Sequence, residues 1–300
     1  MTISVVETIA AMRQLVDSAR GDGRRVGLIP TMGYLHAGHR SLIEHARAET
    51  DLVIVSVFVN PLQFGAGEDL DSYPRDLPGD VATAEEGGAH VVFHPSTAEM
   101  YPGGAPLTRV VVTELSEPLC GRARPGHFDG VSTVVAKLLA TCDPDRAYFG
   151  RKDAQQLVVV AKMAADLNFR TEIVACPTLR EADGLAMSSR NAYLSPEDRA
   201  AAPALYAALM AAAAIVVAGE RETKVVEAAL SDELAGRPRL DVEYAQARDA
   251  RTLAHHEHLD GEVLLAVAAR CGAARLIDNV VIDLSGPEPS VDAGEIKGEP

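Results

Sequence analysis

Cysteine is scarce in this chain, and its four copies lie far apart. Cys120, Cys142, Cys176 and Cys271 form no C-x-x-C pair, so the sequence indicates neither a zinc site nor a disulfide framework. Basic residues are also few: 28 Lys and Arg stand against 43 Asp and Glu, which gives a formal net charge of −15. A nucleic-acid surface needs clustered Lys and Arg to displace counter-ions, so this composition argues against nucleic acid as a partner.

Long apolar segments are the second feature that the sequence is expected to lack. The N-terminus has no extended apolar run, and we expect no stretch of the roughly 18 to 20 apolar residues that cross a bilayer. With 47% hydrophobic residues in 300, the chain can still bury a substantial core, about 75% of its unfolded surface. These features predict a soluble protein of a reducing compartment, and we expect a cytoplasmic location without a membrane partner.

Two apolar runs predict buried parallel strands. Residues 26–29 and the β-branched run 52–59 flank a segment in which Leu42, Ile43 and Ala46 have helical spacing. A strand, a helix and a second strand in this order form a right-handed β-α-β unit, and nearly continuous apolar strands are typical of a sheet covered on both faces. Further strands are expected at 89–94, 145–149 and 171–176. Before the first strand, residues 5–19 have apolar residues at helical spacing, which predicts a helix.

The turn after the first of these strands has the residues of a phosphate site. It reads Pro30-Thr31-Met32-Gly33-Tyr34-Leu35-His36-Ala37-Gly38-His39, which places His36 and His39 on one face of the first helical turn. A helix N-terminus offers unpaired N–H groups and a partial positive charge, to which imidazole donors add. Taken alone, a histidine at a helix start is more often a solvated cap, and H-x-x-H is sometimes half of a metal site.

Three more polar groups stand at strand ends or on the loops that follow them. They are Asn60 with Gln63, Lys152 with Asp153, and the Ser-Ser-Arg turn at 188–190. Ligands of open parallel sheets bind beyond the carboxyl ends of the strands, so we expect these groups to share a crevice with the histidines. Cations in such a crevice stabilise charge on a transferring phosphorus, which favours a reaction at an ATP phosphorus.

Each of these patterns also has a plain structural explanation. Asp153 and Gln156 have the spacing of a capping box, and the Ser-Ser-Arg sequence is common in surface turns. The irregular run 65–80 could be a lid over the site or an ordinary mobile loop. The run 255–258, His-His-Glu-His, is better explained as a solvated loop than as an adventitious metal site.

The character of the chain changes from residue 195 onward. Ala200–Ala218 is alanine-rich and predicts a helix, and a second helix is expected over 223–234. Short strands are expected near 242–244 and 263–268. The tail 285–300 is rich in Gly, Pro and charge, so we expect it to be disordered.

Several stretches occur together in a fixed order. They are HAGH at 36–39, FVNPLQFG at 58–65, DSYPR at 71–75, RPGHFDGV at 124–131, GRKDAQQ at 150–156 and DGLAMSSRN at 183–191. This ordered set resembles the pantothenate synthetase (pantoate–β-alanine ligase) family, from the N-terminus to about Asp283. The H-x-G-H core alone is shared with a wide group of nucleotidylyltransferases, whereas the whole set is highly specific.

The resemblance implies a fold and a two-step reaction. The fold is α/β: a Rossmann-like, doubly wound parallel sheet in an N-terminal domain (1–178), with a smaller α+β C-terminal lid domain (179–284), in a homodimer. In the reaction, the carboxylate of (R)-pantoate attacks the α-phosphorus of Mg·ATP and gives pantoyl adenylate and pyrophosphate. The amine of β-alanine then displaces AMP and forms pantothenate, a precursor of coenzyme A. ATP is thus a substrate, and the sequence does not identify the ligands of Mg²⁺.

The resemblance also assigns roles to residues. His39 is the expected proton donor, and His36 and Lys152 are expected to stabilise the phosphates in the adenylation transition state. Gln63 and Gln156 are expected to hold pantoate, with Gln63 also beside β-alanine. The expected ATP-binding residues are Met32, Gly33, Tyr34, Leu35, His36, Ala37, Gly38, His39, Gly150, Arg151, Lys152, Asp153, Leu179, Met187, Ser188, Ser189 and Arg190.

Two positions depart from the family pattern, and two other functions remain open. Arg151 stands where the family usually has Glu, and Ala154 where it usually has an aromatic residue; Arg151 adds positive charge beside Lys152. A nucleotidylyltransferase would leave AMP on another acceptor as a stable product. A non-catalytic nucleotide-binding protein would bind ATP without releasing pyrophosphate.

Overall fold

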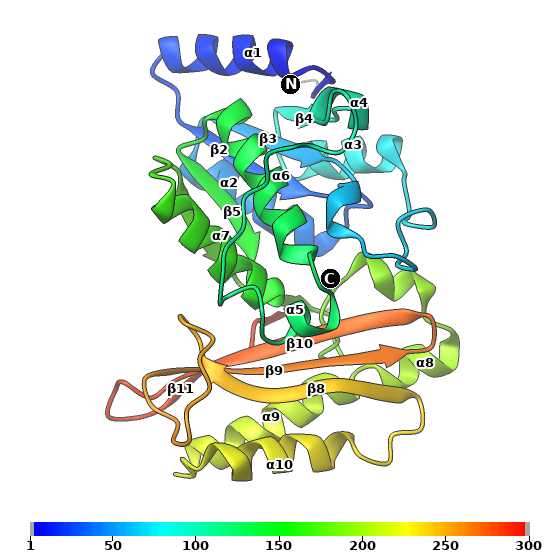
Figure 1. Ribbon diagram of the computed structural model, residues 1–300, viewed down its shortest axis with the longest axis vertical. Coiled ribbons are helices and arrows are strands. Elements are labelled where there is room, and N and C mark those ends of the chain that lie inside the picture. The colour runs from blue at the N-terminus through cyan, green and yellow to red at the C-terminus, as the bar shows by residue number, and fades with distance from the viewer. Residues whose placement is uncertain (1–2, 298–300) are drawn as a thin grey trace. The chain divides into compact units, whose positions relative to one another are not determined.

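A computed structural model describes residues 3–297, which form two compact units (Figure 1). Unit 1 consists of Met1–Glu117, Arg124–Gly150 and Val159–Cys176. Unit 2 consists of Pro118–Ala123, Arg151–Val158 and Pro177–Pro300. The chain therefore passes between the units more than once, and the domain limits expected from the sequence stay predictions.

Unit 1 is built on a six-stranded sheet of parallel strands in the order β1-β4-β3-β2-β5-β6. The strands are β1 (Ser4–Val6), β2 (Val26–Thr31), β3 (Leu52–Val57), β4 (Val91–Phe93), β5 (Arg146–Gly150) and β6 (Glu172–Cys176). From β4 to β6 the order is that of a Rossmann-like sheet, and it reverses between β2 and β5. The expected α/β fold with a parallel central sheet is confirmed.

Helices pack on this sheet through alternate strand residues. The helices are α1 (Ile9–Gly21), α2 (Ala37–Glu49), α3 (Leu77–Glu86), α4 (Thr97–Met100), α6 (His127–Cys142) and α7 (Ala154–Asp166), whose first turn belongs to unit 2. Ile43 and Ala46 of α2 pack against Ile29 and Val55. Ile54 points to the other face because side chains alternate along a strand, and α1 and α6 contact each other and β2.

The start of the chain differs from the expectation. Apolar spacing predicted a helix from about residue 5, but Ser4–Val6 forms an edge strand that pairs with β4. Helix α1 begins only after Thr8, whose hydroxyl oxygen accepts a hydrogen bond from the N–H of Ala11 at 3.2 Å. The N-cap therefore decides where this helix begins.

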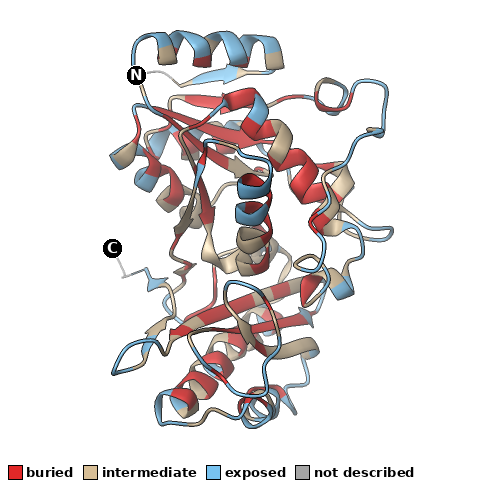
Figure 2. Cartoon of the chain, turned by 60° about the vertical axis from the view of Figure 1, so that its left-hand side comes forward, coloured by how far each residue is buried: buried red, intermediate tan, exposed pale blue. Residues whose placement is uncertain are grey.

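Unit 2 is an α+β structure on a four-stranded antiparallel sheet in the order β11-β10-β9-β8. The strands are β8 (Leu240–Asp249), β9 (Glu262–Cys271), β10 (Ala274–Asp283) and β11 (Ser290–Asp292). Leu209 of α9 (Ala204–Val217) and Leu230 of α10 (Thr223–Leu234) pack against Val267 and Val280 of the sheet. Consecutive residues of β9 are buried, so both faces of this strand are covered (Figure 2). The sequence predicted only fragments of β8 and β9, and it missed β10.

Short elements complete unit 2. A parallel pair is formed by β7 (Leu179–Arg180) and β12 (Glu295–Ile296). The remaining elements are α5 (Cys120–Ala123), α8 (Pro196–Ala201) and the 3-10 turns η2 (Arg151–Asp153) and η3 (Ser189–Tyr193). Two of these short turns carry residues that the sequence assigns to the site.

In the described part of the chain, one stretch, Pro196–Val217, is long and apolar enough to cross a membrane by length and composition. The expectation that no such stretch exists is wrong, because alanine counts as apolar throughout this region. Pro203 interrupts the stretch between α8 and α9. Leu205, Leu209 and Val216 are buried in the core of unit 2, as in the core helix of a globular protein.

The tail forms strands where the prediction was disorder. Ser290–Asp292 pairs with β10 and Glu295–Ile296 pairs with β7, so the expectation is wrong for these residues. The composition of the tail gave no sign that the edges of β10 and β7 would supply partners for the backbone N–H and C=O groups of the tail. Residues 298–300 lie outside the described part of the chain.

Candidate active site

His36 and His39 together cap the N-terminus of α2. Nδ1 of His36 accepts a hydrogen bond from the N–H of Gly38 at 3.1 Å, and Nδ1 of His39 accepts one from the N–H of His36 at 3.3 Å. The ring centroids are 4.1 Å apart. Because each Nδ1 is an acceptor, a neutral ring carries its proton on Nε2, which is the donor that a phosphate oxygen requires. A cap and a phosphate-binding role are thus compatible in the same residues.

The turn in front of the histidines is held by Asp80, a residue of α3 that sequence reasoning did not single out. Its Oδ1 accepts a hydrogen bond from the N–H of Leu35 at 2.7 Å. Gly33 has φ +84°, and a Cβ there would come within 2.7 Å of Oδ2 of Asp80, so this close approach requires glycine. Burial raises the pKa of Asp80, and the hydrogen bond from Leu35 opposes that rise.

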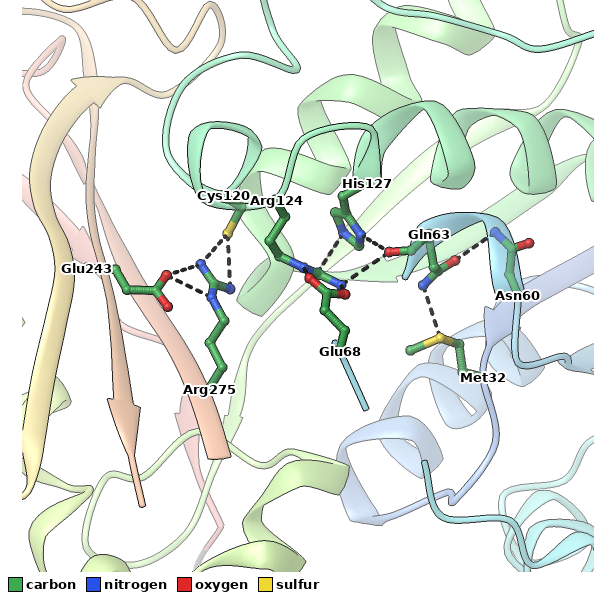
Figure 3. Close-up of polar contacts among 9 residues, drawn as sticks. All are labelled: Met32, Asn60, Gln63, Glu68, Cys120, Arg124, His127, Glu243 and Arg275. Atoms are coloured by element: carbon green, nitrogen blue, oxygen red, sulfur yellow. Dashed lines mark hydrogen bonds and ion pairs between the residues drawn. The ribbon is translucent and has the colours of Figure 1, made fainter. Parts of the chain in front are cut away.

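Gln63 ends the 3-10 turn η1 (Pro61–Gln63) after β3, and hydrogen bonds fix its amide (Figure 3). Its Nε2 donates to Sδ of Met32 at 3.0 Å, and its Oε1 accepts from Nδ2 of Asn60 at 3.0 Å. Asn60 is buried, donates to the carbonyl of Gly130 at 3.1 Å and accepts from the hydroxyl of Tyr101 at 2.8 Å. The structure therefore brings two predicted site residues, Met32 and Gln63, into contact.

A further set of contacts holds the backbone of Gln63 (Figure 3). Arg124 pairs with both carboxylate oxygens of Glu68, at 2.6 and 2.7 Å, and donates to the carbonyl of Gln63 at 3.2 Å. Nδ1 of His127 donates to the same carbonyl at 2.7 Å, and its Nε2 accepts from Arg124 at 3.0 Å. Burial disfavours the charged form of Glu68, but the hydrogen bonds and charge of Arg124 outweigh it and lower its pKa to about 2.

Lys152 lies in η2, a part of unit 2. The Nδ2 of Asn279, on β10, donates to the backbone carbonyls of Arg151 at 3.0 Å and Lys152 at 2.9 Å. The side chain of Arg151 forms an ion pair with Asp292 of β11. The positive charge that departs from the family pattern thus has an acidic partner within unit 2.

Residues expected to contact the nucleotide from the C-terminal half lie on β7 and on the turn at Met187–Arg190, both in unit 2. The N–H of Met187 donates to the carbonyl of Leu179 at 3.0 Å. The hydroxyl of Ser188 accepts from the N–H of Arg190 at 3.3 Å and begins η3. Leu179, Met187, Ser188 and Arg190 are thus close neighbours.

Each unit holds part of the predicted set. Unit 1 contains Met32, Gly33, Tyr34, Leu35, His36, Ala37, Gly38, His39, Gln63 and Gly150. Unit 2 contains Arg151, Lys152, Asp153, Gln156, Leu179, Met187, Ser188, Ser189 and Arg190. Among residues 3–297, no group of three or more His, Cys, Asp or Glu side chains is placed to hold a metal ion. The roles assigned to these residues stay predictions.

A second polar network in unit 2 also escaped the sequence analysis (Figure 3). Sγ of Cys120 lies 3.1 Å from the hydroxyl of Tyr244 and 3.6 Å from two nitrogens of Arg275. Arg275 also pairs with Glu243 at 2.8 Å. Burial raises the pKa of Tyr244 well above its usual value, so this hydroxyl stays protonated at neutral pH.

Comparison with known proteins decides the family. A sequence profile described as pantoate-beta-alanine ligase matches residues 4–281. The chain belongs to this family. It is therefore a ligase that forms an amide bond, and its family resemblance is confirmed.

Relatives of this ligase agree along nearly their whole length. It is 52% identical to the pantothenate synthetase of Geobacillus kaustophilus (strain HTA426), over 98% of this chain and 97% of the relative. A crystal structure of pantothenate synthetase from Thermus thermophilus matches with a TM-score of 0.87 at 46% identity, over 92% of this chain and 98% of that one. A Francisella tularensis pantoate-beta-alanine ligase, complexed with beta-gamma ATP and beta-alanine, matches with a TM-score of 0.74 at 32% identity, over 92% and 97%.

Proposed function

We propose that this ligase condenses (R)-pantoate with β-alanine using ATP, through a pantoyl-adenylate intermediate, and releases AMP and pyrophosphate. The observation that carries the proposal is the reciprocal cap of His36 and His39 at the start of α2. It follows β2, one of the two strands between which the strand order reverses. Helix N-termini at such a point are favourable places for a nucleotide phosphate.

In the first step, a carboxylate oxygen of pantoate attacks the α-phosphorus of ATP, and the bond to the pyrophosphate oxygen breaks. Negative charge on the phosphate oxygens changes as the reaction proceeds, and donors already in place stabilise it. His36 and Lys152 supply such donors, and His39 supplies a proton from Nε2 to an oxygen of the departing pyrophosphate. Removing one charged contact of this kind typically costs about 3 kcal/mol, or roughly a hundredfold in rate.

In the second step, the amine of β-alanine attacks the acyl carbon of pantoyl adenylate. The amide C–N bond forms, AMP leaves with the electron pair of the C–O bond, and the amine releases a proton. Gln63 and Gln156 hold pantoate during both steps, and Gln63 also borders β-alanine. The Francisella tularensis relative, complexed with beta-gamma ATP and beta-alanine, supports ATP and β-alanine as ligands.

ATP is the nucleotide substrate and Mg²⁺ enters with it. Mg²⁺ in proteins is usually held by substrate phosphates with one or two carboxylates and several waters. The backbone and side chains of 32–39, 150–153, 179 and 187–190 surround the nucleotide in this proposal. We also propose that the enzyme is cytoplasmic and forms a homodimer. Analytical ultracentrifugation of the purified chain tests its oligomeric state.

The test of the proposed function is isotope exchange between pyrophosphate and ATP. We expect exchange when pantoate is present and β-alanine is absent, and AMP release once β-alanine is added. Exchange that ignores pantoate would contradict the adenylate intermediate. A stable adenylylated product after addition of β-alanine would favour a nucleotidylyltransferase, and ATP binding without exchange would favour a non-catalytic nucleotide-binding protein.

A further inference from the structure

Asp278 and Asn279 are consecutive residues of β10, a strand flanked on both sides by β9 and β11. Their exposed fractions are 4% and 6%. Side chains of consecutive strand residues point to opposite faces of a sheet. The two polar side chains therefore contact different segments of unit 2.

Asn279 contacts η2. An amide NH₂ has two hydrogens, and the Nδ2 of Asn279 donates to two consecutive carbonyls, those of Arg151 at 3.0 Å and Lys152 at 2.9 Å. Both donors are thereby used on one peptide segment. This contact fixes the backbone from which the Lys152 side chain extends.

Asp278 contacts Arg180, the residue after Leu179, whose carbonyl accepts a hydrogen bond from the N–H of Met187 at 3.0 Å. Its two carboxylate oxygens lie 2.7 and 2.9 Å from the guanidinium nitrogens. Arg180 is fully buried and donates to the carbonyl of Gly184 at 3.0 Å, while its guanidinium carbon lies 4.1 Å from the centroid of the Tyr206 ring. A Cβ at Gly184 would come within 2.2 Å of that ring, so the turn is closely fitted around Arg180.

We propose that Asp278 and Asn279 are positioning residues that hold the segments Arg151–Asp153 and Met187–Arg190 at a fixed spacing for one nucleotide. The inference rests on the proposed function, because the nucleotide roles of Lys152 and Arg190 make that spacing useful. Because the two side chains extend from neighbouring positions of an internal strand, the segments that they hold lose little conformational freedom when ATP binds. Neither residue needs to touch the nucleotide itself.

Asn279→Asp tests the first half of this inference. The substitution keeps the size of the side chain but turns carboxylate oxygens toward two carbonyl oxygens. In pantoate-dependent pyrophosphate exchange, we expect kcat/KM for ATP to fall at least about tenfold, since small displacements of positioned groups have effects of this size. KM for pantoate should change less than twofold. Asn279→Ser keeps one donor and should give an intermediate loss.

The matched control is Thr223→Val. Thr223 is buried in unit 2, and its hydroxyl donates to the carbonyl of His256 at 2.6 Å, so the change also removes one buried bond to a backbone carbonyl. It should lower the melting temperature without changing kcat/KM for ATP. Asn279→Asp should lower both the melting temperature and kcat/KM for ATP. The kinetics of the two variants are compared under conditions in which the same fraction of each protein is folded.

A double-mutant cycle separates positioning from general damage. Because Asn279 acts through the backbone of Lys152, Asn279→Asp should cost much less in a Lys152→Ala background than in the native one. Equal losses in the two backgrounds, or unchanged kinetics in a folded Asn279→Asp protein, would overturn the inference. If the native chain shows no pantoate-dependent exchange, the proposed function fails instead. Titration calorimetry with ATP then decides the inference. The inference requires that Asn279→Asp binds ATP more weakly than the native chain and that Thr223→Val binds it equally well.

Discussion

The carbonyl oxygen of Gln63 accepts hydrogen bonds from both Arg124, at 3.2 Å, and His127, at 2.7 Å. A residue expected to hold two substrates is therefore fixed through its backbone by side chains from another segment of unit 1. Arg124 is fixed in turn by both oxygens of Glu68.

Arg124→Ala should weaken pantoate binding. The change removes a donor from the Gln63 carbonyl and leaves Glu68 without its partner, which should lower stability by about 1 to 3 kcal/mol and raise KM for pantoate roughly tenfold. Steady-state kinetics and chemical denaturation measure both effects. Arg146→Ala is the control, because its ion pairs with Glu49 and Glu172 are more exposed than that of Arg124 with Glu68 and should contribute less than about 1 kcal/mol. An unchanged KM in Arg124→Ala would contradict the positioning of Gln63.

The same ion pair predicts a pH dependence of stability. The pKa of Glu68 is about 2 in the folded chain and 4.5 ordinarily, so its charged form stabilises the fold above about pH 4.5 and that contribution is lost as the pH falls toward 2. Between pH 5 and pH 3, the native chain should lose about 1 to 2 kcal/mol more than Glu68→Gln, which cannot titrate. Urea denaturation at each pH measures this, and parallel curves for the two proteins would refute it.

His39→Ala should separate the cap from the chemistry. Loss of the cap should cost about 1 kcal/mol of stability, and loss of the Nε2 donor should lower pantoate-dependent exchange roughly a hundredfold. Thr8→Ala removes the N-cap of α1 in the same unit, so it should show a similar loss of stability with unchanged exchange. Exchange at the native rate in folded His39→Ala would remove the proton-donor role from this residue.

Gly130→Ala should displace the Gln63 turn. A Cβ at this position of α6 would lie 2.3 Å from the carbonyl oxygen of Leu62 and 2.6 Å from the backbone nitrogen of Gln63. Backbone atoms cannot rotate away, so we expect a loss of about 2 to 3 kcal/mol together with a higher KM for pantoate. Gly21→Ala is the control, since no atom lies within 4 Å of its added Cβ and helix propensity should stabilise it by about 0.5 to 1 kcal/mol. Equal stability of the two variants would show that α6 can move away from the turn.

The parallel sheet could be predicted because its strands are buried on both faces. All six residues of Leu52–Val57 are buried, and five of the six are apolar, so the run is visible in the sequence. β10 was missed because Asp278 and Asn279 interrupt its pattern, and their partners, Arg180 and the carbonyls of η2, lie far away in the sequence. The start of α1 was misplaced because an edge strand and a cap overrode the apolar spacing.

The candidate site could be predicted where its chemistry is local. His36 and His39 are three residues apart, so helical geometry places them together without any knowledge of the fold. Asp80 and Leu35 are 45 residues apart, and Arg124 and Glu68 are 56 apart. No periodicity in the sequence relates such distant pairs, and the contacts that support the site were therefore found only in the structure.

The strands at the end of the chain bear on how the protein should be produced. A terminus rich in glycine and proline is often removed before crystallisation. Ending the chain at residue 284 would remove Asp292, the ionic partner of Arg151, and Ala293, whose carbonyl accepts a hydrogen bond from Arg180. It would also leave the edge of β7 bare beside Leu179. A shortened protein with weak ATP affinity would thus be an artefact of the truncation, and affinity tags are better placed at the other terminus.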